Sequence, residues 1–377
     1  MGAGLRVAWF GHGQDRRGNG LVTYSREVPR ALRDAGAEVL FFYHRHSATT
    51  PPPLSFPLRS LRWGNQDLIS LPGSHVLVAR VLRTVPVDVG HVSFTFSLSM
   101  DWQVPRLLHR LGKPAVATLH FPFGHHLSLW TLISWLVYQV YLPILHQYDA
   151  LIVLGERQRD LLVESGLKAE RIHVVPNAVD VCRYAPGPSD FKEAVGARWM
   201  AVYCGRLDPE KRVDALLRAF TGLDLPPDHK LVVVGDGMVR RQLMGKHGDN
   251  PGVVFTGHLR DEQERIRILR AADCFILPSE VEGLSLALLE AMACGAAPIA
   301  TDAGGDGEVV QGVGIGVRPS HLEEDLEEAI LQLARDPERS RQMGRLARER
   351  VVQRHDLHQQ TQQLLSLYRQ LIQEREG

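Results

Sequence analysis

The sequence predicts an α/β protein built from two doubly wound parallel sheets, one in each of two domains. Its 377 residues exceed what one hydrophobic core usually supports. Short apolar runs alternate with helical stretches in both halves, a rhythm typical of parallel sheets. A Pro- and Gly-rich stretch at residues 185–189 separates the two sets. We therefore expect domains at residues 1–185 and 186–355, and a helix at residues 356–377 that packs back toward the first domain.

The first half contains six apolar runs that predict strands. They are residues 6–11, 38–43, 87–94, 114–121, 150–155 and 171–175. The helical pattern of residues 21–35 stops at Gly36, and glycine commonly ends helices. Residues 47–75 are rich in Pro, Ser and Leu and fit no element well, so we expect an exposed excursion there.

The second half repeats the alternation. Its predicted strands are residues 200–204, 230–235, 253–256, 274–277, 297–301 and 314–317. From Leu322 onward the pattern is helical and heavily charged. Two such domains facing each other would form a central cleft between the carboxyl ends of their strands, where open α/β sheets bind ligands.

Charge and cysteine usage bound the setting of the protein. The chain has 43 basic and 43 acidic residues, yet residues 1–185 hold 19 Lys/Arg against 13 Asp/Glu. This basic half favours contact with lipid head groups or phosphates, although a similar excess occurs in domains with no such partner. The four cysteines show no Cys-x-x-Cys pair, which favours a reducing compartment over a metal knuckle or a disulfide framework. The N-terminus has no long apolar signal region, so we expect a cytoplasmic protein.

Residues 127–145 form one long segment without a formal charge. Gln139, Pro143 and the strand patterns on both sides argue against a membrane span. A core helix and an interfacial helix both remain open. Trp130 and Trp135 favour an acceptor-facing or membrane-surface role.

The most informative motif runs from Glu282 to Glu290, directly after a predicted strand. We expect a helix to begin near Ser285, so that its free backbone N–H groups and positive dipole end suit a diphosphate. One acid would then hold a sugar and the other a ribose. The alternative is an ordinary amphipathic helix with solvated acids.

Three further clusters follow predicted strands of the second half. Residues 205–213 place Arg206 and Lys211 on one loop, which suits a diphosphate clamp but is also typical of a basic turn. Residues 235–237 (Gly-Asp-Gly) indicate a tight turn that is common in any protein. Residues 255–259 offer backbone groups to a base edge. Four such clusters at strand ends favour a nucleotide-sugar site.

In this combination the chain resembles the glycosyltransferases of GT-B fold in the large retaining family 4, which have two facing Rossmann-like domains. That family shows Gly-Arg-Leu-x-x-x-Lys, a Gly-x-Gly turn, Phe-x-Gly, Glu-Gly-Phe-Gly-Leu-x-x-x-Glu and Thr-Asp-x-Gly-Gly-x-x-Glu. The counterparts here begin at Gly205, Gly235, Phe255, Glu282 and Thr301.

The resemblance implies a role for each matching residue. Arg206 and Lys211 would bind the donor diphosphate, and Glu290 the ribose hydroxyls. Glu282 would bind the transferred sugar, and Leu259 would contact the base through its backbone. The rest of the implied donor site is Gly18, Asn19, Gly20, Gly205, Gly283, Leu284, Ser285 and Leu286. Ser285 replaces a family glycine, so it fits only if its backbone does not need a positive φ or if its hydroxyl takes over a hydrogen bond.

The acceptor side is implied by fewer residues. His120 stands where the family has a cleft histidine, and it would join Arg206, Lys211 and Glu282 as a catalytic residue. A lone histidine at a strand end is also typical of a satisfied structural group. Phe121, Trp130 and Trp135 are the candidate acceptor contacts.

No carboxylate of the first half indicates a double-displacement nucleophile, which agrees with the front-face route proposed for retaining GT-B enzymes. There the leaving diphosphate helps to deprotonate the incoming hydroxyl. No Asp-x-Asp metal site is visible, so we expect a metal-independent enzyme without a cofactor.

A narrower resemblance, to bacterial digalactosyldiacylglycerol synthases, rests on residues 18–28, 120–123 and 148–153 and on the aromatic segment. It implies transfer of galactose from UDP-galactose to monogalactosyldiacylglycerol, by a protein peripheral on a membrane and without a nucleic-acid partner. The alternatives are a family 4 enzyme with another donor or a soluble acceptor, a nucleotide-sugar epimerase, and a non-catalytic sugar-nucleotide binder.

Overall fold

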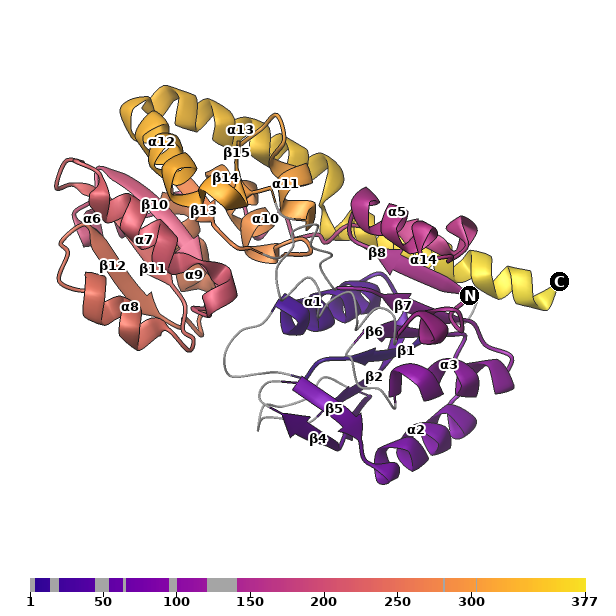
Figure 1. The fold of residues 1–377 in the computed structure, drawn as a ribbon. Coiled ribbons are helices and arrows are strands. Elements are labelled where there is room, and N and C mark those ends of the chain that lie inside the picture. The colour runs from indigo at the N-terminus through magenta and orange to yellow at the C-terminus, as the bar shows by residue number, and fades with distance from the viewer. Residues whose placement is uncertain are drawn as a thin grey trace. The chain divides into compact units, whose positions relative to one another are not determined.

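The protein is described by a computed structural model covering residues 4–13, 20–44, 54–63, 66–94, 100–120, 141–280, 282–302 and 304–377. The chain divides into two compact units (Figure 1). Unit 1 comprises residues 1–176 and 358–377, and unit 2 comprises residues 177–357.

The first boundary lies before the predicted one at residue 185. The segment after Pro176 is tied to unit 2 because the Val179 N–H donates to the His355 carbonyl at 2.9 Å. The Leu357 N–H donates in turn to the Val179 carbonyl at 3.0 Å. Nearly all of the last helix, α14 (Leu357–Glu376), belongs to unit 1.

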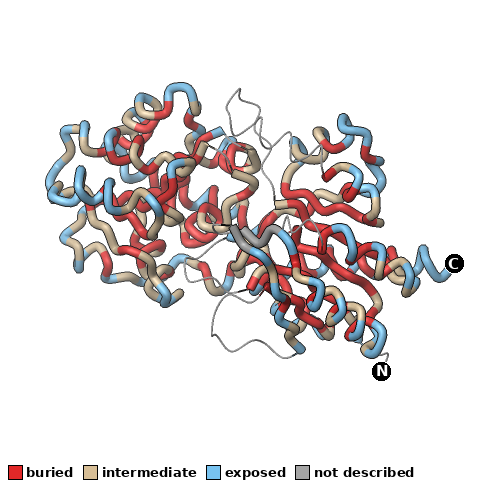
Figure 2. The backbone as a smooth tube through the Cα atoms, turned by 60° about the horizontal axis from the view of Figure 1, so that its bottom comes forward, coloured by how far each residue is buried: buried red, intermediate tan, exposed pale blue. Residues whose placement is uncertain are grey.

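Unit 1 contains a seven-stranded sheet in the order β3-β2-β1-β6-β7-β8-β9, with every pair parallel. The strands are β1 (Arg6–Gly11), β2 (Glu38–His44), β3 (Ser55–Leu58), β6 (Val89–Ser93), β7 (Ala115–Thr118), β8 (Ala150–Val153) and β9 (Ile172–Val174). The helices are α1 (Gly20–Asp34), α2 (Pro72–Thr84), α3 (Met100–Arg110), α5 (Glu156–Glu164) and α14, with a 3-10 turn η1 (Ala169–Arg171). The central strands are buried along their length, because helices supply apolar side chains to the sheet (Figure 2).

The excursion predicted for residues 47–75 is wrong where the structure describes it. Strand β3 joins the sheet edge beside β2, and β4 (Ser60–Trp63) pairs antiparallel with β5 (Gln66–Ser70). Pro57 is compatible with β3 because an edge strand needs no ladder N–H on its outer side. Pro72 stands in the first turn of α2, where its missing N–H costs nothing. Residues 47–53 lie outside the described residues.

Unit 2 contains a six-stranded parallel sheet in the order β12-β11-β10-β13-β14-β15. The strands are β10 (Trp199–Cys204), β11 (His229–Val234), β12 (Val253–Gly257), β13 (Cys274–Leu277), β14 (Ala297–Thr301) and β15 (Ile315–Val317). The helices are α6 (Phe191–Val195), α7 (Val213–Gly222), α8 (Arg240–His247), α9 (Glu262–Ala271), α10 (Leu286–Ala293), α11 (Gly304–Val310), α12 (Leu322–Arg335) and α13 (Pro337–Arg354). Two 3-10 turns, η2 (Pro209–Lys211) and η3 (Pro319–His321), complete the unit.

The order of these strands creates a switch point. Strand β10 lies between β11 and β13, so the connections that leave β10 and those that follow β13 run in opposite directions across the sheet. Loops at the carboxyl ends of such neighbouring strands diverge and leave a crevice for a ligand. The loops that follow β10 and β13 carry the two strongest motifs of the sequence.

None of the helices in the described ranges is long and apolar enough to span a bilayer. Most of the uncharged segment at residues 127–145, including Trp130 and Trp135, lies outside those ranges.

Candidate functional site

The loop after β10 is held in place by the turn after β11. The Gly205 N–H donates to the Val234 carbonyl at 3.0 Å, and the Leu207 N–H donates to the Asp236 carbonyl at 3.0 Å. Gly235 has a φ of +144°, and a Cβ placed on it would lie 1.9 Å from the Gly205 carbonyl oxygen. The Gly-Asp-Gly turn therefore supports the loop that carries Arg206, because only glycine permits this approach.

Arg206 is fixed by two carboxylates of its own loop. Its guanidinium pairs with Asp208 and donates to Glu210 Oε1 at 2.8 Å. Asp208 is buried, and its Oδ1 accepts the Met238 N–H at 2.9 Å. These contacts hold the cation at the carboxyl end of β10.

Lys211 reaches across the switch point. Its ammonium pairs with the Glu282 carboxylate in the loop after β13, and both side chains are largely buried. The ion pair joins the basic loop to the first acid of the main motif. A bound diphosphate would compete with Glu282 for this ammonium, and the released carboxylate could then accept hydrogen bonds from sugar hydroxyls.

The loop after β13 is clamped at three consecutive residues. The Gly305 N–H donates to the Gly283 carbonyl at 2.6 Å, and the Asn177 side-chain amide donates to the Leu284 carbonyl at 2.7 Å. The Ser285 N–H donates to Asp306 Oδ1 at 2.7 Å. We refer to residues 282–285 as the sugar loop. Its conformation is set by backbone hydrogen bonds, so it is preorganised for a ligand.

Ser285 satisfies both conditions that its replacement of glycine imposes. Its φ is −73°, so its backbone does not need the left-handed region. Its hydroxyl accepts the Leu288 N–H at 3.4 Å and caps helix α10. The helix begins at Leu286, directly after the residue where the sequence predicts its start.

Asp306 is a buried acid that accompanies the sugar loop. Burial raises the pKa of its carboxyl well above the usual range, and Glu282 raises it further, while the bond from the Ser285 N–H acts in the opposite direction. Glu282, the other acid of this cluster, has Lys211 as its partner.

Glu290 lies in the second turn of α10 and is 5% exposed. Arg265, in the first turn of α9, forms an ion pair with it, with Nε 3.2 Å from Oε2. Burial raises the pKa of the Glu290 carboxyl, and Arg265 opposes that rise. Glu290 is thus a paired acid in the interior of the unit and not the solvated helix acid of the alternative interpretation.

Leu259 lies in the loop between β12 and α9. Its main-chain N–H and C=O make no hydrogen bond to other residues in the described part of the chain. Contact of these groups with a base edge stays a prediction.

Four residues that hold this site escaped the sequence analysis as site residues. They are Asn177, Asp208, Arg265 and Asp306. Asp208 and Asp306 stand inside the family motifs that begin at Gly205 and Thr301, so their positions gave a signal. Arg265 gave none, because an arginine in the first turn of a charged helix is typical of a solvated surface.

His120 lies directly beyond β7 in unit 1, with Nε2 3.1 Å from the Ser93 hydroxyl. The Tyr24 ring packs edge-on against it, with centroids 4.4 Å apart. Burial, followed by the nearby His12, lowers the pKa of His120 to about 3. The imidazole is therefore neutral at physiological pH. Gly20 begins α1, whereas Gly18, Asn19, Phe121, Trp130 and Trp135 lie outside the described residues.

A buried chain of hydrogen bonds supports this region of unit 1. Tyr368 of α14 contacts His91 Nδ1 at 2.5 Å, and His91 Nε2 contacts the Thr118 hydroxyl at 2.8 Å. Thr118 in turn contacts the Tyr24 hydroxyl at 3.2 Å. These hydrogen bonds link α14 to Tyr24, which packs against His120.

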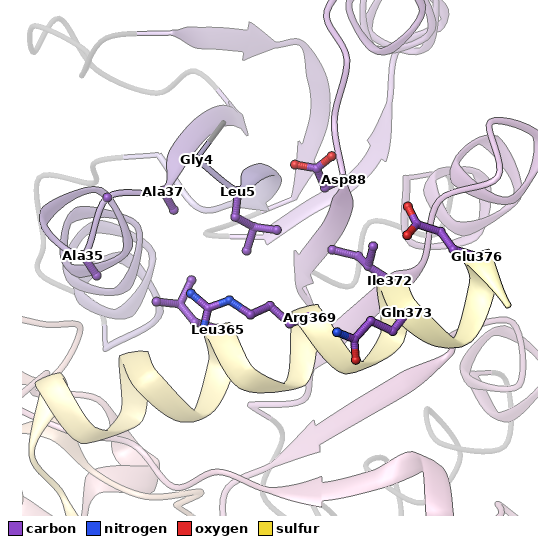
Figure 3. A pocket seen from close by; sticks show the side chains of 11 residues that line it. Gly4, Leu5, Ala35, Ala37, Asp88, Leu365, Arg369, Ile372, Gln373 and Glu376 are labelled. Atoms are coloured by element: carbon purple, nitrogen blue, oxygen red, sulfur yellow. The ribbon is translucent and has the colours of Figure 1, made fainter. Parts of the chain in front are cut away.

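A pocket of about 560 Å³ lies at the amino ends of β1, β2 and β6, between these strands and α14 (Figure 3). His120 lies beyond the carboxyl end of β7, at the opposite end of the strands. Apolar side chains such as Leu5, Leu365 and Ile372 share it with Arg369 and Asp88. No residue predicted for the site lines this pocket.

No group of three or more His, Cys, Asp or Glu side chains is arranged to hold a metal ion within the described ranges. Metal independence stays a prediction for the enzyme assay.

Comparison with known families covers both units. The model named Glycosyltransferase Family 4 matches residues 18–183, and the model named Glycosyl transferases group 1 matches residues 189–350. Together these matches extend over most of the chain. The chain belongs to the GT-B glycosyltransferases of family 4. This membership agrees with the two parallel sheets and with the motifs of unit 2.

Relatives of this glycosyltransferase span several reactions. It is 29% identical to the alpha-maltose-1-phosphate synthase of Mycolicibacterium smegmatis over 247 residues, which are 59% of this chain and 63% of that protein. It is 34% identical to a GDP-mannose-dependent monoacylated alpha-(1-6)-phosphatidylinositol monomannoside mannosyltransferase of Corynebacterium glutamicum over 194 residues, 47% of this chain and 50% of that protein. The chain therefore spans about half to two thirds of these relatives.

Among solved structures, sucrose-phosphate synthase from Thermosynechococcus elongatus has the same fold, with a TM-score of 0.83. The match covers 98% of this chain and 100% of that one at 22% identity. Likeness at this level of identity describes the fold alone.

Proposed function

We propose that the protein is a retaining hexosyltransferase that takes its sugar from a nucleotide-sugar donor bound at the switch point of unit 2. The observation that carries this proposal is the Lys211–Glu282 ion pair across the ends of β10 and β13. It supports the proposal because a cation that would bind phosphate and an acid that would bind the sugar come together beside the amino end of α10.

The roles follow from charge. Arg206, Lys211 and the first turn of α10 would bind the diphosphate, because all three present N–H donors and positive potential. Glu282, freed from Lys211, and the backbone of the sugar loop would bind the transferred hexose. Glu290 would accept hydrogen bonds from the ribose hydroxyls.

Catalysis would rest on stabilising the leaving diphosphate. The same cations are held in place before the donor arrives, so little reorganisation is needed as charge develops on the leaving oxygen. The leaving phosphate would take the proton of the acceptor hydroxyl on the same face of the sugar, which preserves the anomeric configuration. Neutral His120 would accept or donate a hydrogen bond to the acceptor and would not supply charge.

For the substrates, we propose galactose from UDP-galactose and a membrane glycolipid such as monogalactosyldiacylglycerol, with the protein peripheral on the membrane. The basic composition of residues 1–185 supports an anionic surface as partner. The corynebacterial relative is named for a phosphatidylinositol mannoside acceptor, which supports a glycolipid.

A second donor deserves equal testing because that same relative is named as GDP-mannose-dependent. Mannose from GDP-mannose would use the same clamp, since both donors present a diphosphate and a ribose.

The deciding experiment offers the purified protein UDP-galactose, UDP-glucose and GDP-mannose, each with glycolipid vesicles and with soluble sugars. We expect a lipid product from one donor. Product on soluble sugars alone would overturn the lipid acceptor, and product from GDP-mannose alone would replace the donor. A Glu290→Ala variant with unchanged donor affinity would overturn the ribose assignment.

A further inference from the structure

Arg265 contacts both carboxylate oxygens of Glu290. Its Nε lies 3.2 Å from Oε2, and its Nη2 donates to Oε1 at 3.4 Å. The two residues come from different helices, α9 and α10, so the contact joins separate elements of unit 2. Glu290 is buried, and a buried carboxylate without a counter-charge would take up a proton.

The contact uses only part of the acceptor capacity of Glu290. An ionised carboxylate offers about four acceptor positions, and Arg265 Nη2 donates to one of them, on Oε1. The Nε of Arg265 approaches Oε2 as an ion pair without making a hydrogen bond. A vicinal diol needs two acceptor positions, one for each hydroxyl. A protonated carboxyl would use one oxygen as a donor and could no longer accept from two hydroxyls.

The guanidinium of Arg265 also contacts residues other than Glu290. Its Nη2 contacts the Tyr184 hydroxyl, and that hydroxyl donates to Glu262 Oε1 at 2.9 Å. Arg183 donates to the other oxygen of Glu262 at 3.0 Å. The network thus contains two cations, Arg183 and Arg265, and two acids, Glu262 and Glu290. Tyr184 lies among them and is 2% exposed.

We propose that Arg265 is a positioning residue of the donor site, which keeps Glu290 ionised and oriented to accept both ribose hydroxyls. The inference rests on the proposed function, because it assumes that Glu290 binds the ribose. It adds a residue from α9, outside every motif of the sequence, and it states how that residue acts.

The charge state of Glu290 makes the inference testable by pH. The groups that face it are Arg265, Glu262, Tyr184, Arg183, Cys204 and Cys294. Arg265 is the cation in contact with it, so removal of Arg265 leaves burial to raise the pKa of Glu290 further. Ribose binding by such a variant would then be weak at low pH and would recover as Glu290 ionises at higher pH.

The experiment measures binding of UDP, GDP and their 2′-deoxy forms by calorimetry at pH 6 and pH 8.5. We expect the wild-type protein to bind its nucleotide about tenfold more tightly than the deoxy form at both pH values, as expected for a hydrogen bond to a charged group. For Arg265→Gln we expect a ratio near one at pH 6 and a partial recovery at pH 8.5. Arg265→Lys keeps the charge and should keep the ratio independent of pH, although its overall affinity falls.

Arg267→Gln is the matched control. It makes the same change two residues along the same helix, where Arg267 pairs with Asp190 at 2.6 Å and Glu264 at 2.8 Å. Residues two apart point to different sides of a helix, so this variant should bind like the wild type.

The outcomes separate the two proposals. A wild-type protein that binds neither nucleotide, or a Glu290→Gln variant that keeps the full ribose preference, would overturn the ribose site itself. If Glu290→Gln loses the preference while Arg265→Gln keeps it at pH 6, the ribose site stands and the role of Arg265 is wrong. Thermal unfolding midpoints without ligand show whether each variant is folded.

Discussion

Individual side chains of the proposed donor site are paired with one another. Lys211 and Glu282 neutralise each other, and Arg206 is shared between Asp208 and Glu210. If these cations bind a diphosphate, as we propose, the ligand must displace the carboxylates, which costs some affinity. The same pairing would hold the cations in place where the leaving diphosphate develops charge.

We predict that Lys211→Met lowers kcat/KM for the donor by about a hundredfold or more, because it removes a charged donor to the diphosphate and leaves Glu282 without its partner. Steady-state kinetics with the active donor would measure this. Lys230→Met is the control, since Lys230 donates to the carbonyls of Pro227 and Pro251 at the amino end of β11. Equal kinetics for both variants would contradict the diphosphate role of Lys211.

Ser285 gives a second prediction for a single residue. Ser285→Ala removes the cap of α10 and should lower the free energy of unfolding by about 1 kcal/mol, whereas Ser285→Gly should cost only a few tenths of a kcal/mol. Urea unfolding of the two variants tests this order. A larger loss for glycine than for alanine would show that the hydroxyl is not the stabilising group.

The sequence singled out Lys211 and Glu282 as candidates for the donor site, but it did not predict that they contact each other. Glu282 and Lys211 are 71 positions apart in the chain, and nothing in their local patterns indicates that they pair. The pairing follows from the neighbouring positions of β10 and β13, which is a property of the sheet.

Elements of unit 2 position the site through close backbone contacts. The turn after β11 supports the loop after β10, and α11 supports the sugar loop, where a Cβ on Gly304 would lie 2.0 Å from the Glu282 carbonyl oxygen. Loops that rest on each other in this way transmit a change in one to the residues of the next.

We predict that Gly235→Ala displaces the loop that carries Arg206. The variant combines a φ of +144° with a contact of 1.9 Å, so we expect a loss of stability of about 2 kcal/mol or more and a weaker binding of the donor. Gly196→Ala is the control, because Gly196 has a φ of +65° but nothing within 4 Å of its Cβ. It should lower stability by about 1 kcal/mol and leave donor affinity unchanged. Equal donor affinity in both variants would argue against a supporting role for the turn.

Strands were predicted from sequence better than the connections between them. The long buried runs of β10, β11 and β14 have no competing interpretation. Strands β3, β4 and β5 mix polar and apolar residues, and residues 51–53 are three prolines in a row, so the local pattern favoured a loop. Pairing with β2 overrode that local preference for β3.

The molecule as a whole should be sensitive to acid. Burial lowers the pKa of His91 and of His120 to about 3 and that of His355 to about 4. Below the unfolded pKa of about 6.5, the unfolded chain binds protons that the folded protein does not. Stability from these groups is therefore fully present above pH 6.5 and falls as the pH approaches 4, by about 1.4 kcal/mol per pH unit for each histidine.

Thermal unfolding between pH 7 and pH 5 checks this. His355→Asn keeps a donor for the Asn177 carbonyl. It should remove about one third of the acid sensitivity, because each of the three histidines contributes the same loss of stability per pH unit. His321→Asn changes an exposed residue and should leave the acid sensitivity of the protein unchanged. An unfolding midpoint that does not change between pH 7 and pH 5 would contradict neutral burial of the three histidines.

At the scale of the whole molecule the sequence predicted two doubly wound units with a division at residue 185, whereas the compact units of the structure divide at residue 176. The Pro-Gly stretch at residues 185–189 has the composition of a linker, yet the chain leaves unit 1 at Pro176. Backbone pairing of Val179 with Asp356 decides the boundary, and composition does not report such pairing.

The central claim is that unit 2 holds a nucleotide sugar for transfer with retention. The most direct test identifies the product formed from each of UDP-galactose, UDP-glucose and GDP-mannose with glycolipid vesicles, and determines its anomeric configuration by NMR. We predict that one donor yields a lipid-linked hexose with the anomeric configuration of the donor, and that Lys211→Met slows the formation of this product by about a hundredfold or more. An inverted linkage, or no sugar transferred from any of the three donors, would contradict the account.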